Sequence, residues 1–217
     1  MKPLGKVRIR WSPDFAYAIG LLVTDGCLSS DKRHIILTSK DREMIENFKT
    51  CLAVQNKISN HRSGAGTYGF RIQFGDVLFY DFLNRIGLSS RKSKILPRID
   101  VPREYFFDFL RGHFDGDGCF YSYWDSRWRS SFMYYTTFNS ASEKHLLWLR
   151  AEISAEAGVH GHMIKTGKTP MYTLRYAKAE SLKLLPRMYY NADVVCLSRK
   201  RKKIVSALTV IGERLTK

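Results

Sequence analysis

A nine-residue pattern that occurs twice constrains this chain more than any other feature of its sequence. The copies read AIGLLVTDG at Ala18–Gly26 and LRGHFDGDG at Leu110–Gly118. Each is an apolar run with small residues four positions apart, which share a face when the run is helical. A face without bulk lets two helix axes approach to about 8–10 Å or less. We therefore expect two helices that pack on each other through Gly20 and Thr24 in the first copy and Gly112 and Gly116 in the second.

Each copy ends in Asp-Gly, which predicts where its helix stops. Glycine readily adopts the left-handed conformation of a C-terminal cap, so we expect Gly26 and Gly118 as caps, with Asp25 and Asp117 in the last turns. A carboxylate there is unfavourable by roughly 0.3–1 kcal/mol, because the helix C-terminus carries partial negative charge. One such run alone is more often a helix entering a turn, but the repetition in register argues for a functional site. Bound divalent cations would offset the penalty.

The segments after each motif follow the same order. In the first half the pattern predicts a hairpin ending with a strand over His34–Ser39, a helix that starts at Asp41, a second hairpin, and a helix capped by Asp76. The outgoing strand of the second hairpin alternates apolar residues with Arg71 and Gln73, so one face is core and the other can form hydrogen bonds.

The second half repeats this order after Pro102. Strands are expected at 120–125 and 132–139 around the turn Arg127-Trp128-Arg129, and Ser140 with Glu143 suggests a capping box for the next helix. In the strand at 171–176, Thr173 and Arg175 occupy the positions of Arg71 and Gln73. Basic loops close the two halves, at Arg91–Lys94 and at Leu197–Lys200, and a last helix follows the second loop. We place the N-terminal half at residues 1–96 and the C-terminal half, with its closing helix, at 97–217.

Charge and composition indicate a polyanionic partner. Lys and Arg number 36 against 20 acidic residues, a formal charge of +16, and nucleic acid is the first candidate for an excess of that size. No long apolar run or signal-peptide core is present, so we expect an intracellular protein, cytoplasmic in a prokaryote or organellar, without a membrane partner. The cysteines lack a Cys-x-x-Cys pair, which favours reduced thiols over a zinc cage or a disulfide framework.

At the two motifs the sequence resembles the LAGLIDADG homing endonucleases, specifically their single-chain members with two motifs. The resemblance implies an α+β fold of two pseudo-symmetric αββαββα halves, motif helices packed at their interface, and an antiparallel β-saddle on DNA. It also implies that the acid before the last glycine binds the catalytic metal, which assigns Asp25 and Asp117 as catalytic acids and the metal site to Asp25, Asp117, Gly26 and Gly118. The first copy has Val23 where the second has Asp115, a departure that leaves the later acid in place.

The implied activity is a staggered double-strand break in a long, asymmetric DNA target. Mg²⁺ is the expected cofactor, with Mn²⁺ substituting and Ca²⁺ supporting binding, and a metal can activate water and stabilise the leaving oxygen. Because the family carries a lysine in the basic loop that closes each half, Lys92 and Lys200 are candidate catalytic residues, with phosphate anchoring as the alternative. Residues expected to contact DNA are Lys40, Arg71, Gln73, Arg127, Trp128, Arg129, Thr173, Arg175 and Arg199.

Other interpretations remain open from the sequence. An intron maturase or a DNA-binding regulator of the same fold would keep the saddle and the charge without needing both acids. A structural RNA-binding protein would explain the charge but not the duplicated motif, and no splicing segments flank the motifs as in an intein. Because one chain carries both motif helices, we expect a monomer that needs no protein partner.

Overall fold

The computed structural model describes residues 5–62, 66–90, 96, 98–166 and 171–215. Among these residues, the N-terminal half contains α1 (Pro13–Thr24), β1 (Gly26–Leu28), β2 (His34–Ser39), α2 (Arg42–Cys51), β3 (Ser59–Arg62), β4 (Tyr68–Gly75) and α3 (Val77–Arg85). A 3₁₀ turn, η2 (Arg103–Tyr105), leads into the C-terminal half: α4 (Phe106–Asp117), β5 (Gly118–Trp124), β6 (Phe132–Ser140), α5 (Glu143–Ala157), β7 (His162–Thr166), β8 (Met171–Tyr176) and α6 (Lys178–Met188). A last helix, α7 (Ser198–Val210), follows.

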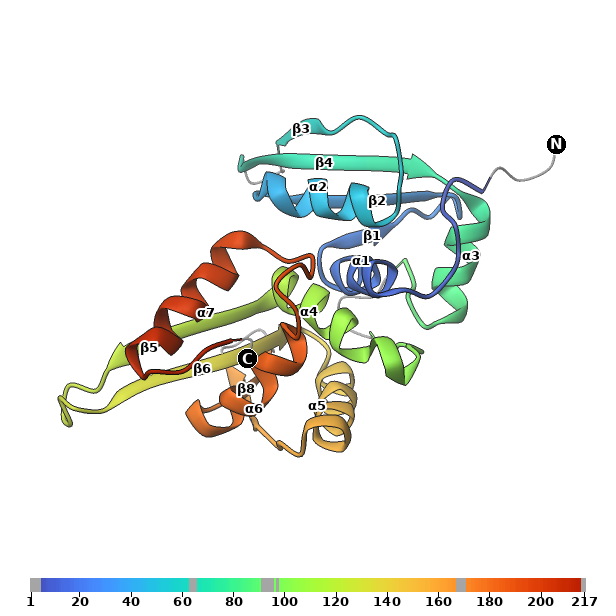
Figure 1. Cartoon of the computed structure of the whole chain (residues 1–217). Coiled ribbons are helices and arrows are strands. Elements are labelled where there is room, and N and C mark those ends of the chain that lie inside the picture. Colours follow the sequence, from blue (N-terminus) through green and yellow to red (C-terminus); the bar gives the residue numbers. More distant parts are fainter. Residues whose placement is uncertain (1–4, 63–65, 91–95, 97, 167–170, 216–217) are drawn as a thin grey trace.

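The two halves have the same sheet topology, which confirms the expected αββαββα repeat. Each sheet has four antiparallel strands, in the order β1-β2-β4-β3 and β5-β6-β8-β7. The registers also correspond, because Gly26 pairs with Leu37 in the first sheet and Gly118 pairs with Phe138 in the second. Figure 1 shows the sheets on either side of the α1 and α4 pair. The boundary between residues 96 and 97 stays a prediction.

Alternation along the strands separates a core face from an open face. In the first sheet Leu37 and Ile72 are buried under α2 and α3, whereas Thr38 and Arg71 point to the opposite side. The second sheet repeats this arrangement with Phe138 and Leu174 beneath α5 and α6. Each sheet therefore presents its polar positions on the face away from its helices. None of the helices in the described part of the chain has the length and apolar character needed to cross a bilayer.

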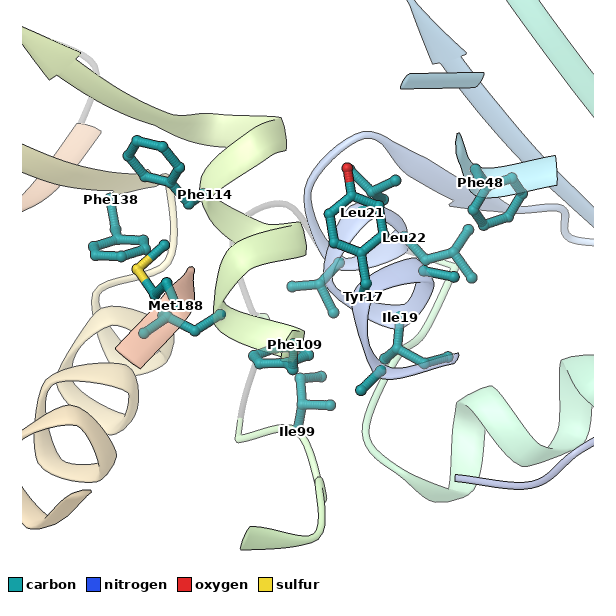
Figure 2. Packing of buried hydrophobic residues seen from close by; sticks show 14 of the residues in the cluster. Tyr17, Ile19, Leu21, Leu22, Phe48, Ile99, Phe109, Phe114, Phe138 and Met188 are labelled. Atoms are coloured by element: carbon teal, nitrogen blue, oxygen red, sulfur yellow. The ribbon is translucent and has the colours of Figure 1, made fainter. Parts of the chain in front are cut away.

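Helices α1 and α4 pack on each other through their glycines, as the motif predicts. A methyl group on Gly20 would lie under 3.0 Å from the backbone of Phe109, and one on Gly112 would lie equally close to the backbone of Tyr17. Phe48 covers the far side of α1, while Phe138 and Met188 cover the far side of α4 (Figure 2). The crossing point of the motif helices is thus also the centre of the hydrophobic core.

The predicted left-handed caps are wrong. Gly26 and Gly118 do not have positive φ, and each is the first residue of a strand instead. Glycine is needed there for space, because a methyl group on Gly26 would lie 2.6 Å from the carbonyl oxygen of Leu22, and one on Gly118 would lie 2.6 Å from that of Phe114. The chain turns from helix to strand so tightly that the preceding helical turn leaves no room for a side chain.

Two further boundaries differ from the sequence predictions. The N-cap of α5 is Ser142, whose Oγ accepts a hydrogen bond from the backbone N–H of His145, so Ser140 with Glu143 is not a capping box. Ser140 lies at the end of β6, where its Oγ accepts a hydrogen bond from the N–H of Ser142. The prediction of a second basic loop at Leu197–Lys200 is also wrong, because Arg199 and Lys200 lie in the first turn of α7. The first basic loop, with Lys92, lies outside the described residues.

Candidate functional site

The two motif acids occupy the ends of α1 and α4. Asp25 is the C-cap of α1 and is half-buried, whereas Asp117 is the last residue of α4 and is exposed. The Thr24 hydroxyl lies 3.0 Å from both the Leu21 carbonyl oxygen and Asp25 Oδ2, so it can donate to either. Gly116 lies against Thr24 and Asp25 across the helix interface. The end of one helix therefore helps to form the surroundings of the other helix's acid.

Each acid lines a cavity of its own. The cavity at Asp25, the first pocket, measures about 460 Å³ and is bounded by Asp25, Thr38, Ser39, Lys40, Met44, His61, Thr67, Tyr68, Gly69, Gly116 and Arg199. The cavity at Asp117, the second pocket, measures about 180 Å³ and is bounded by Val23, Thr24, Leu96, Asp117, Asn139, Ser140, Ala141 and Met171.

The two pockets are built from equivalent positions of the two halves. In each, the acid of one helix faces the small residue that precedes the acid of the other helix, Gly116 in the first pocket and Thr24 in the second. Leu37 and Phe138 are equivalent, because each pairs with the last glycine of its motif. The next residues along the two strands, Thr38 and Asn139, are therefore equivalent too. The duplicated motif therefore creates two related sites.

The pockets differ in charge. Lys40, which directly follows β2, lines the first pocket together with Arg199, whereas the position equivalent to Lys40 in the second pocket is Ala141. Among the described lining residues, the first pocket thus has cationic side chains that the second does not.

Asn139 supplies a polar contact in the second pocket that the sequence did not suggest. Its Nδ2 donates to the backbone carbonyl of Asp117 at 2.7 Å, and its Oδ1 accepts from the Thr173 hydroxyl at 2.7 Å. Thr173, expected to face DNA, thereby holds Asn139 against the end of α4. Sequence reasoning missed Thr38 and Asn139, although each directly follows the residue that pairs with the motif's last glycine.

Lys200, expected as a catalytic residue with phosphate anchoring as the alternative, forms hydrogen bonds at the end of α4. Its ammonium group donates to the carbonyl oxygens of Phe114, Asp115 at 2.8 Å and Gly118 at 2.7 Å. The first two carbonyls belong to the last turn of α4, whose final C=O groups lack helical partners, and the third belongs to Gly118, the first residue of β5. Burial lowers the pKa of Lys200 to about 8. With its three N–H donors engaged, Lys200 caps α4 and holds the strand-entry turn beside Asp117, and a direct catalytic contact would require those bonds to break.

Arg199 joins the two halves at the first pocket. Its Nε donates to Asp41 Oδ2 at 2.7 Å, while the other carboxylate oxygen of Asp41 accepts the Glu43 N–H at the start of α2. The backbone N–H of Ser198 donates to Glu43 as well. The N-terminus of α7 is therefore fixed to the N-terminus of α2, which places a guanidinium from the C-terminal half in the pocket of the N-terminal acid.

Asp115, the second acid of the C-terminal motif, has a different environment from Asp117. It is fully buried, and its Oδ2 accepts hydrogen bonds from the Tyr17 hydroxyl at 2.9 Å and from the Leu197 N–H at 2.7 Å. Burial raises its pKa to about 6, although Lys200 opposes that effect. Asp115 thus anchors the segment before α7 to the helix pair and does not face either pocket.

The residues expected to read bases lie on the open faces of the sheets. Arg71 Nη2 donates to Gln73 Oε1 at 2.6 Å, which orients both side chains on β4. The Arg175 guanidinium on β8 lies 5.0 Å from the centre of the Tyr135 ring. Arg127, Trp128 and Arg129 are exposed in the turn between β5 and β6. Both arginines on the strands are held by a neighbour, one by an amide and one by an aromatic ring.

The donor set of the pockets fits a hard cation that keeps part of its water shell. No group of three or more His, Cys, Asp or Glu side chains comes together anywhere in the described residues, so a closed protein cage of such ligands is absent there. Mg²⁺ is commonly held by one or two carboxylates together with waters and substrate phosphates. Asp25 and Asp117, each lining a pocket together with hydroxyl or amide side chains, meet that requirement.

Comparisons with known proteins agree with this architecture. Residues 12–87 match the family model of the LAGLIDADG-like domain. A comparison with curated proteins gives no match.

Solved structures resemble the whole chain. The I-LtrWI LAGLIDADG homing endonuclease bound to target DNA has a TM-score of 0.62 at 11% identity, over 92% of this chain and 90% of that one. Meganuclease I-SmaMI bound to uncleaveable DNA has a TM-score of 0.58 at 15% identity, over 96% and 92%. Full-length DUF199/WhiA from Thermatoga maritima has a TM-score of 0.58 at 14% identity, over 94% of this chain and 63% of that one. At these identities the likeness establishes the shared fold.

Proposed function

We propose that this chain is a site-specific DNA endonuclease, because residues 12–87 match the model of the LAGLIDADG-like domain and the fold is shared with LAGLIDADG homing endonucleases over most of the chain. The proposed reaction is hydrolysis of one phosphodiester bond in each strand of a long, asymmetric duplex, giving a staggered break. The observation that carries the proposal is the pair of equivalent pockets, each lined by one motif acid. A binding-only protein would not need an acid in both.

The open faces of the two sheets are the proposed DNA-binding surface. A two-stranded β-ribbon fits the major groove, and its alternate side chains then face the base edges. Arg71 and Gln73 on the first sheet, and Thr173 and Arg175 on the second, occupy such positions. Since the two sets differ, the two halves of the target should differ as well. The charge of +16 would favour the approach to DNA.

The pocket residues have separable roles in the proposed reaction. Asp25 and Asp117 would hold Mg²⁺, which supplies Lewis acidity at the phosphate and lowers the pKa of water when bound. Lys40 can place its exposed ammonium against non-bridging phosphate oxygens in the first pocket. Asn139 can orient a water in the second pocket through its amide. Lys200 keeps the end of α4 in place, and so positions Asp117 without touching the phosphate.

We propose that one polypeptide acts alone, because α1 finds its partner helix within the same chain. The proposed setting is intracellular, in a prokaryotic cytoplasm or an organelle. The alternative function is an intron maturase, or a binding-only nucleic-acid protein, of the same fold. It predicts binding without cleavage.

Selection from a randomised duplex library tests the proposal. The protein is incubated with the library in Mg²⁺, and cleaved ends are captured and sequenced. The matched control is the double variant Asp25→Asn, Asp117→Asn, which removes both charges with little change in shape. We expect one asymmetric sequence with staggered ends from the wild type and none from the control. Enrichment of bound but uncut duplexes by both proteins would support the binding-only alternative.

A further inference from the structure

The hairpin of β5 and β6 is much longer than its counterpart in the N-terminal half. β1 pairs with β2 over 3 residues, whereas β5 pairs with β6 over 7. Both pairings begin at the same position, at Gly26 and at Gly118. At about 3.4 Å per residue, the additional pairs lengthen the C-terminal hairpin by roughly 13 Å. Figure 1 shows the hairpin projecting from the body on the side away from the N-terminal half. We call residues 121–135 the β5–β6 arm.

The open face of the arm is aromatic and ordered. Tyr121 and Tyr135 stack with ring centres 5.2 Å apart, and Tyr123 stacks on Tyr135 at 6.3 Å. Arg175 lies on the Tyr135 ring, so this aromatic surface continues directly from the residues proposed to read bases. Stacking restricts the rotamers of these side chains, which keeps the surface rigid. The arm thus extends the proposed DNA-binding face and does not form a separate patch.

The tip of the arm exposes one large aromatic and two cationic side chains. Trp128 is 70% exposed, and Arg127 and Arg129 are exposed beside it. The turn is held by backbone hydrogen bonds from Ser131 to Trp128 and from Asp125 to Ser131. Asp125 also accepts the Arg127 N–H at 2.9 Å and lies 3.6 Å from Arg127 Nε. A formed turn that leaves an indole and two guanidinium groups in solvent fits a polyanionic partner.

We propose that the β5–β6 arm binds target duplex beyond the stretch reached by the N-terminal half. The inference rests on the proposed DNA binding but does not require cleavage. With one base pair per 3.4 Å, an extension of roughly 13 Å covers about four base pairs. The target is therefore asymmetric in length as well as in sequence, with the longer half under the C-terminal sheet. The arginines contact phosphates there, and Trp128 packs against the backbone.

Trimmed duplexes test this directly. The probe is the target recovered by selecting bound duplexes in Ca²⁺ buffer, which does not depend on cleavage. Affinity is measured for the full duplex and for duplexes shortened by about four base pairs at either end. The variant is Arg127→Ala, Arg129→Ala. Its matched control, Arg85→Ala, Lys183→Ala, removes two exposed positive charges from α3 and α6, which cover the other faces of the sheets.

We expect the wild type and the control to lose about tenfold or more in affinity when one end is trimmed, and little when the other end is trimmed. The arm variant should lose a similar factor on the full duplex and nothing further on the trimmed one. Its salt slope should fall by about 2, because each phosphate contact contributes about 0.9.

Equal losses at both ends would overturn the proposal, as would an arm variant that keeps the wild-type response to trimming. Such a result would leave the proposed nuclease activity intact, since cleavage is scored separately. Conversely, one-sided trimming losses in a protein that never cleaves would support the arm's role and refute the nuclease.

Discussion

Replacing Gly112 by alanine is the sharpest test of the helix crossing on which both pockets depend. The added methyl group would lie under 3.0 Å from the carbonyl group of Tyr17, which belongs to the backbone of α1 and cannot rotate away. The helices must therefore separate by about 1 Å, and overpacking of this kind costs about 1–3 kcal/mol, here near the upper end. Alanine also favours the helix by about 1 kcal/mol relative to glycine. The expected net loss is about 2 kcal/mol.

Urea denaturation measures this loss as a lower midpoint at unchanged slope. In thermal unfolding, a loss of about 2 kcal/mol lowers the Tm of a chain of this size by roughly 4–8 °C. Ala151→Gly, on the exposed face of α5, calibrates the propensity contribution without a clash. If Gly112→Ala instead made the protein more stable, by the amount that helix propensity alone contributes, the close approach of α1 and α4 would be refuted. In that case the pockets could not be formed as described.

Asp115→Asn removes a carboxyl group whose pKa is raised by burial from 3.8 to about 6. Because the folded state holds that proton more tightly than the unfolded state, the wild type loses stability as pH rises from about 4 to 6, whereas the variant does not. Urea denaturation across pH should therefore show the variant gaining about 3 kcal/mol relative to the wild type over that range. Arg71→Ala should relax preference at one or two base pairs and cost about 1–3 kcal/mol there, and a uniform loss across all single-base variants of the target would contradict base reading. Lys40→Ala should slow cleavage of one strand more than the other, so that nicked circles accumulate, and denaturing gels of end-labelled duplex identify the strand. Light scattering should show a monomer and a 1:1 complex with one duplex in Ca²⁺, whereas two proteins on a palindrome would contradict an intramolecular helix pair.

Much of the fold could be predicted because local patterns and the repeat agreed. The strand over His34–Ser39, the helix start at Asp41 and the cap Asp76 depend on neighbours in sequence, and the structure has them as expected. The glycines that end the motifs were misjudged in one respect. A glycine in the sequence can be required either for a left-handed φ or for lack of space, and the sequence does not tell these two causes apart. At Gly26 only the geometry of the helix-to-strand turn shows that lack of space is the cause.

The candidate site was predictable only where the motif itself carries it. Asp25 and Asp117 follow from the motif, whereas Thr38 and Asn139 become pocket residues through strand pairing that leaves no local signal. The burial of Lys200 could not be predicted from its neighbours in sequence. Those neighbours are basic and indicated an exposed loop, whereas Lys200 is buried against the end of α4, which is far away along the chain.

If Asp25 and Asp117, one in each pocket, are the catalytic acids of a DNA endonuclease, removing either charge should abolish double-strand cleavage. Asp25→Asn and Asp117→Asn, made singly, are assayed on supercoiled plasmid carrying the selected target, with affinity measured in Ca²⁺. Each substitution removes one metal-binding charge with little change in shape. We expect that neither variant produces linear plasmid and that both bind the target as the wild type does. Linear product from either variant at the wild-type rate would contradict this expectation.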